Sequence, residues 1–245
     1  MDWFSGAPPP PEYQAVAWLV NIATVVETVG WTINYGESIY RSVKDRTYGM
    51  AIFPMCLNLS WEIVYTLVYP CNDTYQWIMI ISWLLVNPGI VLSAIRYAPN
   101  EWQHAPLVKD NIRLIFFLTI VACILGQLAA AATLGPGVAA TVIACLCYLL
   151  LTVGSLCQLL VRGSSRGTSY TMWASRFLGN LAAGLSAHLK LKYWPQIFGF
   201  LDSPLMTWFV AITTIVELCY LFVLRHIQAK ESADRQNLLI TDKKR

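Results

Sequence analysis

Long apolar runs follow one another along almost the whole chain, each about long enough to cross a bilayer. A helix needs roughly 20 mainly apolar residues to span the ~30 Å hydrocarbon core. The runs of this kind cover residues 15–40, 49–69, 75–97, 111–133, 137–161, 169–190 and 204–226. The segments between them are short, so successive helices should run antiparallel. The pattern predicts an all-α polytopic membrane protein with seven transmembrane helices.

Composition and the chain ends agree with this prediction. Hydrophobic residues make up 56% of the 245 residues and charged residues only 13%, about half the charged fraction of a soluble domain. We expect a lumenal N-terminal segment at 1–14, a transmembrane domain at 15–226 and a cytosolic tail at 227–245. The N-terminal segment lacks the basic region of a cleavable signal peptide. The tail is mixed in charge and is predicted to have no fold of its own.

The basic residues predict the orientation. If alternate loops are assigned to the cytosol, all but Lys190 and Lys192 of the 17 lysines and arginines fall on that side. Cytosolic loops carry such an excess of Lys and Arg. We therefore expect the N-terminus in the lumen and the C-terminus in the cytosol. The expected location is the membrane of the endoplasmic reticulum.

The second apolar run carries an acid, Glu62, near its middle. A carboxyl in hydrocarbon costs a few kcal/mol or more, and such side chains normally face a bundle interior or a cavity. Asn58, Tyr65 and Tyr69 lie at helical spacings from Glu62, so we expect a polar and aromatic stripe that points inward. The alternative is a structural role, in which Glu62 hydrogen-bonds a neighbouring helix.

Other polar side chains also lie at membrane depth. Counting ~1.5 Å per residue from the cytosolic helix ends places Glu27 and Glu62 ~20 Å deep and Glu217 ~13 Å deep. The three acids could therefore share one cavity. Arg176, about two turns into the sixth helix, could pair with an acid. Hydrogen bonding between helices is the favoured interpretation for the two amides at this depth, which are Asn87 and Gln127.

Several function classes lack their motifs in this sequence. The seventh helix has no lysine for a retinal Schiff base, and aspartate-rich magnesium motifs, a glycine-rich phosphate loop and a Ser-His-Asp pattern are all missing. The cysteines do not have metal-ligand spacing. We expect proton chemistry without a metal or cofactor, and no nucleic-acid partner.

A buried acid among aromatic rings suits one kind of chemistry. Burial disfavours the charged form of a carboxyl, so such a group stays protonated and can act as a general acid. Aromatic faces can stabilise a carbocation by ~0.5–2 kcal/mol each. Each ring considered alone is better explained by packing, but together with the acid they favour acid-initiated cyclisation of an apolar polyene. The rings are Trp31, Trp61, Tyr65, Trp83, Trp173 and Tyr220.

Several segments are similar to those of a known family. They are YGMAIFP at 48–54, WEIVY at 61–65, EWQHAPLV at 101–108, CQLLVRGSSRGTSYTMWASRFLG at 157–179 and YWPQIF at 193–198. Over essentially its whole length the chain resembles the fungal integral-membrane terpene cyclases of indole-diterpene and meroterpenoid pathways, the paxilline-type cyclase family. The resemblance implies an enzyme that protonates the terminal epoxide of a prenylated aromatic substrate and drives a cation-olefin cascade. RGSSRGTSY and YWP favour the indole-diterpene branch.

The resemblance also implies site residues. The acid of the WE motif matches Glu62, and the acid of the seventh helix matches Glu217, where many family members have the shorter Asp. Both are assigned as catalytic, while Glu27 matches no family motif. The lipophilic substrate is expected to enter from the bilayer, and other pathway enzymes in the same membrane are possible partners. The residues assigned to the substrate pocket are Asn58, Trp61, Tyr65, Trp31, Tyr220 and Arg176.

A small seven-helix transporter is the alternative. Such folds can be built from a three-helix repeat, which should make the first and last three helices similar. The run at 15–40 has no proline and its pattern does not recur at 137–161, so the repeat is not supported. A seven-helix receptor is also disfavoured, because its basic and aromatic signatures are missing from the predicted cytosolic face.

Overall fold

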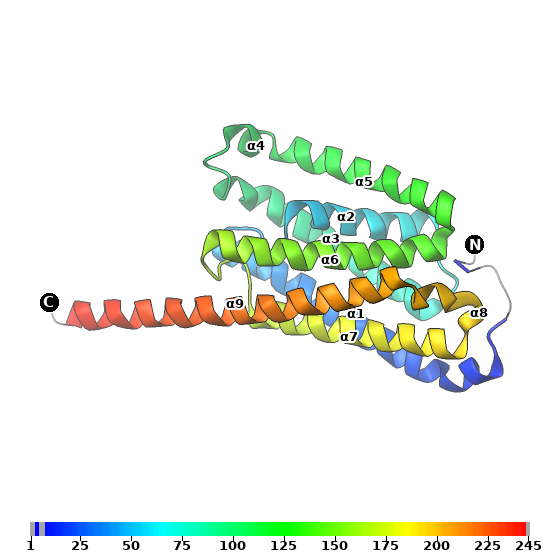
Figure 1. The fold of residues 1–245 in the computed structure, drawn as a ribbon. Coiled ribbons are helices and arrows are strands. Elements are labelled where there is room, and N and C mark those ends of the chain that lie inside the picture. Colours follow the sequence, from blue (N-terminus) through cyan, green and yellow to red (C-terminus); the bar gives the residue numbers. More distant parts are fainter. Residues whose placement is uncertain (1–2, 5–7, 244–245) are drawn as a thin grey trace.

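The computed structural model describes residues 3–4 and 8–243, and the part of the chain that it describes contains helices but no strands (Figure 1). Short connecting helices are η2 (Ala98–Asn100), α4 (Pro106–Asp110), α8 (Pro195–Phe198) and η3 (Gly199–Asp202). The long elements are α1 (Pro11–Asp45), α2 (Ile52–Ile63) with the π-helical turn η1 (Val64–Val68), α3 (Thr74–Tyr97), α5 (Ile112–Leu134), α6 (Pro136–Arg162), α7 (Tyr170–Tyr193) and α9 (Pro204–Lys243). These long elements correspond to the apolar runs of the sequence.

Five helices are long and apolar enough to cross a membrane, namely α1, α3, α5, α6 and α9. The segment formed by α2 and η1 is apolar but shorter, and α7 is not among the five. The prediction of an all-α membrane protein is therefore confirmed. The number of seven spans and the orientation of the termini stay predictions.

The packing of the helices places α2 inside the bundle. Its neighbours are α3, α5 and α6, while α1 packs along α7 and α3, and α9 packs mainly on α6 (Figure 1). Because α2 has helices on several sides, most of its side chains are buried. An acid on this helix therefore has protein neighbours on more than one helix.

Two glycines allow α1 and α7 to approach closely. A Cβ atom added to Gly30 would lie 2.6 Å from the carbonyl oxygen of Ser175 and 3.0 Å from the Cα of Gly179. Gly36 lies on the same helix, and a Cβ there would meet no heavy atom within 4 Å outside its own helix. Gly36 can therefore serve as the control position for a substitution at Gly30.

We expect Gly30→Ala to lower the free energy of unfolding by ~1–3 kcal/mol, because the backbone of α7 must shift to admit the methyl group. Gly36→Ala should raise it by ~0.5–1 kcal/mol, because Gly costs this much relative to Ala inside a helix. Thermal unfolding of the purified protein in detergent measures both. Equal effects of the two variants would contradict the close contact.

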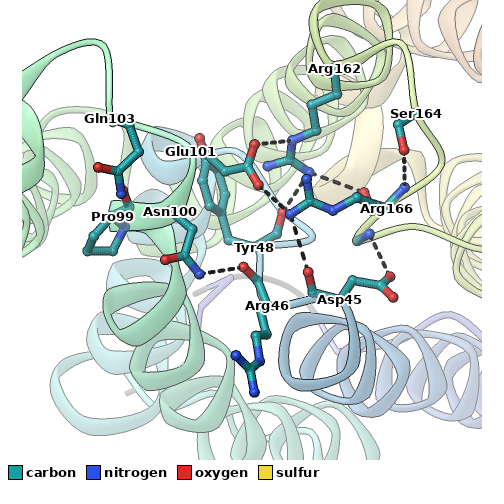
Figure 2. Close-up of polar contacts among 11 residues, drawn as sticks. Asp45, Arg46, Tyr48, Pro99, Asn100, Glu101, Gln103, Arg162, Ser164 and Arg166 are labelled. Atoms are coloured by element: carbon teal, nitrogen blue, oxygen red, sulfur yellow. Dashed lines mark hydrogen bonds and ion pairs between the residues drawn. The ribbon is translucent and has the colours of Figure 1, made fainter.

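Polar side chains join the loops at one end of the bundle, where α1, α3 and α6 finish (Figure 2). A carboxylate oxygen of Glu101 lies 3.0 Å from Arg166 Nη2, and the other lies 3.7 Å from Arg162 Nε. Arg162 also donates to the carbonyl of Tyr48 at 3.0 Å, and its guanidinium lies 4.7 Å from the centre of that ring. Three of the family-like segments thus meet in one network.

The tail after Arg225 is helical, so the prediction that it has no fold of its own was wrong. Helix α9 continues without a break to Lys243 and projects beyond the other helices (Figure 1). The stretch 226–243 contains neither Gly nor Pro, so a helix already formed in the bundle can propagate through it. Glu231 fixes the start of this extension, because its carboxylate accepts the backbone N–H of Ser165 at 2.8 Å.

Candidate active site

Glu62 is fully buried and receives hydrogen bonds from three helices. The hydroxyl of Tyr35 on α1 donates to Oε1 at 2.9 Å, and Nδ2 of Asn58 on α2 donates to the same oxygen at 3.1 Å. Nδ2 of Asn87 on α3 donates to Oε2 at 2.9 Å. Glu62 is 0% exposed, while Tyr35 and Asn87 are each 1% exposed. Both carboxyl oxygens are therefore satisfied inside the bundle.

Local sequence explains part of this arrangement. Asn58 and Glu62 are four residues apart on one helix face, so their side chains meet. Two residues after Glu62, at Val64, the helix changes to the π-helical turn of η1, a form that occurs often at functional sites. Among the residues that the structure describes, no cation forms an ion pair with Glu62. The groups around its carboxyl are neutral donors.

Glu217 is also fully buried, but its partner is a cation. Arg176 Nε lies 2.7 Å from Oε1 and Arg176 Nη2 lies 2.9 Å from Oε2, which makes a two-point ion pair between α7 and α9. The hydroxyl of Tyr148 on α6 donates to Oε1 at 2.9 Å. The side chains of Arg176 and Glu217 are 2% and 0% exposed. Arg176 thus pairs with an acid, as its depth in the sixth predicted span suggested.

Two aromatic side chains complete the surroundings of this ion pair. The guanidinium of Arg176 lies 5.3 Å from the ring centre of Tyr220, whose hydroxyl hydrogen-bonds that of Thr168. The indole N–H of Trp173 donates to the backbone carbonyl of Glu217 at 3.2 Å. These contacts hold the charged groups against α7 and α9.

A cluster of rings lies between the two acids. Trp31 on α1 has its ring centre 5.8 Å from that of Tyr35, a partner of Glu62, and 5.9 Å from that of Tyr148, a partner of Glu217. Trp83 on α3 packs edge-on against Trp31 at 6.3 Å. The two acids are therefore connected through the rings of their hydrogen-bond partners. Neither acid faces the outside of the bundle.

The remaining predicted pocket residues lie elsewhere around Glu62. The indole N–H of Trp61 donates to the carbonyl of Ala140 at 2.9 Å, and its ring packs against Tyr65 and Trp3. The hydroxyl of Tyr65 is buried and has no hydrogen-bond partner within the described chain. Asn58, Trp31, Arg176 and Tyr220 contact the acids or their partners, whereas Trp61 and Tyr65 pack with the N-terminal Trp3.

Glu27 does not share the site of Glu62, which corrects the predicted equal depth. Tyr35 on α1 contacts Glu62, and Glu27 lies eight residues earlier, ~12 Å along the helix. The error comes from the helix ends, because α1 continues to Asp45 and α2 begins only at Ile52. Glu27 is half-buried and takes part in none of the ion pairs within the described chain.

Both amides hydrogen-bond across helices, as predicted. Gln127 on α5 donates to the carbonyl of Leu57 on α2 at 3.3 Å. Asn87 on α3 donates to the carboxyl of Glu62 on α2 at 2.9 Å. Tyr35 and Tyr148 were missed by the sequence analysis. Each lies inside an apolar span, away from the interfaces where Tyr usually gathers, and this position was the available signal.

An open groove lies on the surface beside α7 and α9. It has a volume of about 430 Å³ and is lined by Tyr170 of α7 and by Leu218, Leu221, Phe222 and Arg225 of α9. Leu218 and Leu221 are within about one turn of Glu217 on the same helix. Over the described ranges, no three His, Cys, Asp or Glu side chains gather as metal ligands.

The long apolar helices enclose two acids, Glu62 and Glu217, that are fully buried. Residues 4–230 match the model of the family described as Pyr4-like transmembrane terpene cyclases. The chain belongs to this family, which confirms the resemblance. It is therefore an integral membrane cyclase that acts on a lipophilic substrate.

Named relatives are similar in sequence to this chain over nearly their full lengths. The chain is 51% identical over 231 residues to terpene cyclase cdmG of Talaromyces verruculosus, covering 94% of this chain and 96% of that protein. It is 44% identical to terpene cyclase paxB of Penicillium paxilli, covering 92% and 95%. It is also 44% identical to terpene cyclase pyr4 of Aspergillus fumigatus, covering 94% and 95%. Family membership sets the transporter alternative aside.

Proposed function

We propose that this cyclase protonates the terminal epoxide of an epoxyprenylated aromatic substrate, of the indole-diterpene type, and drives a cation-olefin cascade. The observation that carries this proposal is the fully buried carboxyl of Glu62, which lies among neutral donors and beside a cluster of rings. Relatives named as terpene cyclases support the reaction class.

The surroundings of the two acids support different roles for them. A buried carboxyl without a cation favours its neutral form, because an isolated charge in a low-dielectric interior is very costly. Glu62 therefore carries the proton that starts the reaction. Glu217 is held by both arms of the Arg176 guanidinium, which favours the carboxylate. Glu217 acts as a fixed negative charge near the cation, or as the base that ends the cascade.

The initiating step balances with these groups alone. The O–H bond of Glu62 breaks as the proton moves to the epoxide oxygen, and the C–O bond opens toward a tertiary cation. The electron pair of the nearest alkene then forms the first C–C bond. Loss of a proton from the last cation to a base, for which Glu217 is the candidate, closes the cascade. Return of a proton to Glu62 restores the acid, so no external oxidant or reductant is consumed.

The apolar interior contributes positioning and dryness. Folding the prenyl chain so that each alkene lies near the next cationic carbon can lower the barrier by up to ~7–11 kcal/mol. Exclusion of water prevents early quenching of the cation. Rings of the cluster, Trp31 and Trp83 among them, offer faces that stabilise positive charge. The groove beside Tyr170 and Phe222 is the candidate entry from the bilayer.

The proposed topology has seven spans, with α2 and η1 together as the second and α7 as the sixth. Two observations support these spans: the long helices alternate in direction along the chain, and basic residues lie at the end where α1, α3 and α6 finish. Basic residues gather on the cytosolic side, so this end faces the cytosol and the N-terminus faces the lumen. The proposed location is the endoplasmic reticulum, beside other enzymes of the same pathway.

The test is product analysis with membranes that contain the wild-type protein. Epoxidised geranylgeranyl-indole should be converted to a cyclised isomer of equal mass, while the same compound without its epoxide should be recovered unchanged. Treatment with EDTA should not alter the yield, because the acid is a side chain. Cyclisation of the compound without the epoxide would contradict the proposed initiation. A farnesyl-aromatic epoxide tests the prenyl length.

A further inference from the structure

Proton transfer leaves a negative charge on Glu62, and burial makes this charge costly. When the proton moves to the epoxide, the side chain becomes a carboxylate with 0% exposure and no ion-pair partner among the described residues. A buried charge is costly unless hydrogen bonds compensate it. An acid in an apolar site would therefore hold its proton too firmly to start the reaction.

The structure supplies three hydrogen-bond donors to this one carboxyl. Tyr35, Asn58 and Asn87 come from α1, α2 and α3, and they cover both oxygens at 2.9 to 3.1 Å. Gln127, by comparison, donates to a backbone carbonyl, that of Leu57. The three donors at Glu62 converge on the atoms where negative charge develops.

We propose that Tyr35, Asn58 and Asn87 form a donor cradle that stabilises the carboxylate of Glu62 as its proton leaves. The inference rests on the proposed function, in which Glu62 is the acid. Donors fixed in advance at a developing charge lower the barrier without the cost of reorganisation. The three are positioning residues, since they act through Glu62.

Tyr35 is the best-fixed member of the cradle. Its ring centre lies 5.8 Å from that of Trp31 and 6.5 Å from that of Trp83, so the ring is packed from two sides. Its hydroxyl donates to Glu62 and accepts from Asn58. Removal of the hydroxyl alone should therefore weaken the cradle and leave the packing intact.

The experiment compares Tyr35→Phe with wild type in the membrane assay, with rates normalised to inserted protein. We expect kcat to fall about 10- to 100-fold, as for the loss of a hydrogen bond to a charged group, with KM unchanged. The solvent deuterium isotope effect on kcat should rise, because proton transfer becomes more rate-limiting. Partial misfolding would lower the rate without changing that isotope effect.

Two further variants keep the test decisive. The control is Tyr40→Phe. Tyr40 lies on the same helix as Tyr35 and is 52% exposed, so this variant should behave as wild type. Asn87→Leu removes the donor to Oε2 and should repeat the rise in isotope effect. One outcome is that the wild type cyclises the epoxide while Tyr35→Phe and Asn87→Leu have the same kcat and isotope effect as the wild type. That result would contradict the proposed role of the donor cradle and leave the proposed function intact. An inactive wild type would instead overturn the proposed function.

Discussion

Membranes that contain Glu62→Gln should yield no cyclised product, and the epoxide substrate should be recovered intact. Glutamine has nearly the shape of glutamate and can still accept hydrogen bonds from Tyr35 and Asn58 through its amide oxygen. It has no proton acidic enough to open an epoxide. General acids commonly contribute 10²- to 10⁴-fold in rate, and here the acid also starts the cascade. Mass spectrometry of extracted products measures the loss.

The control for this variant is Glu27→Gln. Glu27 is also an acid inside a long apolar helix, but it is half-buried. It lies ~12 Å along α1 from Tyr35, the hydrogen-bond partner of Glu62. We expect it to keep wild-type turnover at an equal level of inserted protein. Unchanged turnover in Glu62→Gln would remove Glu62 from the mechanism, and loss of turnover per inserted protein in both variants would show that the effect is not specific to Glu62.

The sequence was sufficient to predict the helices, and the reasons are physical. A bilayer imposes a minimum helix length, so the long apolar runs appear with little shift in the structure. A charged group in hydrocarbon needs a partner, which is why the depth of Arg176 pointed to an ion pair. The family-like motifs then selected Glu62 and Glu217 among the acids.

Contacts between distant helices could not be predicted in the same way. The depth of an acid can be counted from a helix end only if that end is known. The ends of α1 and α2 differ from the predicted ones by a few residues, and this difference places Glu27 at another depth than Glu62. The partners Tyr35 and Tyr148 come from α1 and α6, so their contacts depend on how the helices rotate and pack. Tyr65 shares the helix of Glu62 at the expected spacing, yet its hydroxyl does not reach the carboxyl.

Arg176→Met should be one of the most destabilising single substitutions in this chain. It leaves Glu217 buried without its cation, and removal of one partner of a buried pair typically costs 3–5 kcal/mol. Glu217→Gln should also destabilise, since Arg176 is then the unpaired charge. The double variant Arg176→Met/Glu217→Gln removes both charges, so its loss of stability should be smaller than the sum of the two single losses.

Thermal unfolding in detergent measures this coupling, and product analysis separates stability from chemistry. If Glu217 is the fixed negative charge or the base, the double variant should regain stability but not the wild-type product. Initiation by Glu62 would persist, so incompletely cyclised or otherwise terminated products should accumulate. Additive stability losses would show that the ion pair contributes nothing as a pair. Wild-type product from the stable double variant would show that the cascade needs Glu62 alone, with Glu217 and Arg176 serving the fold.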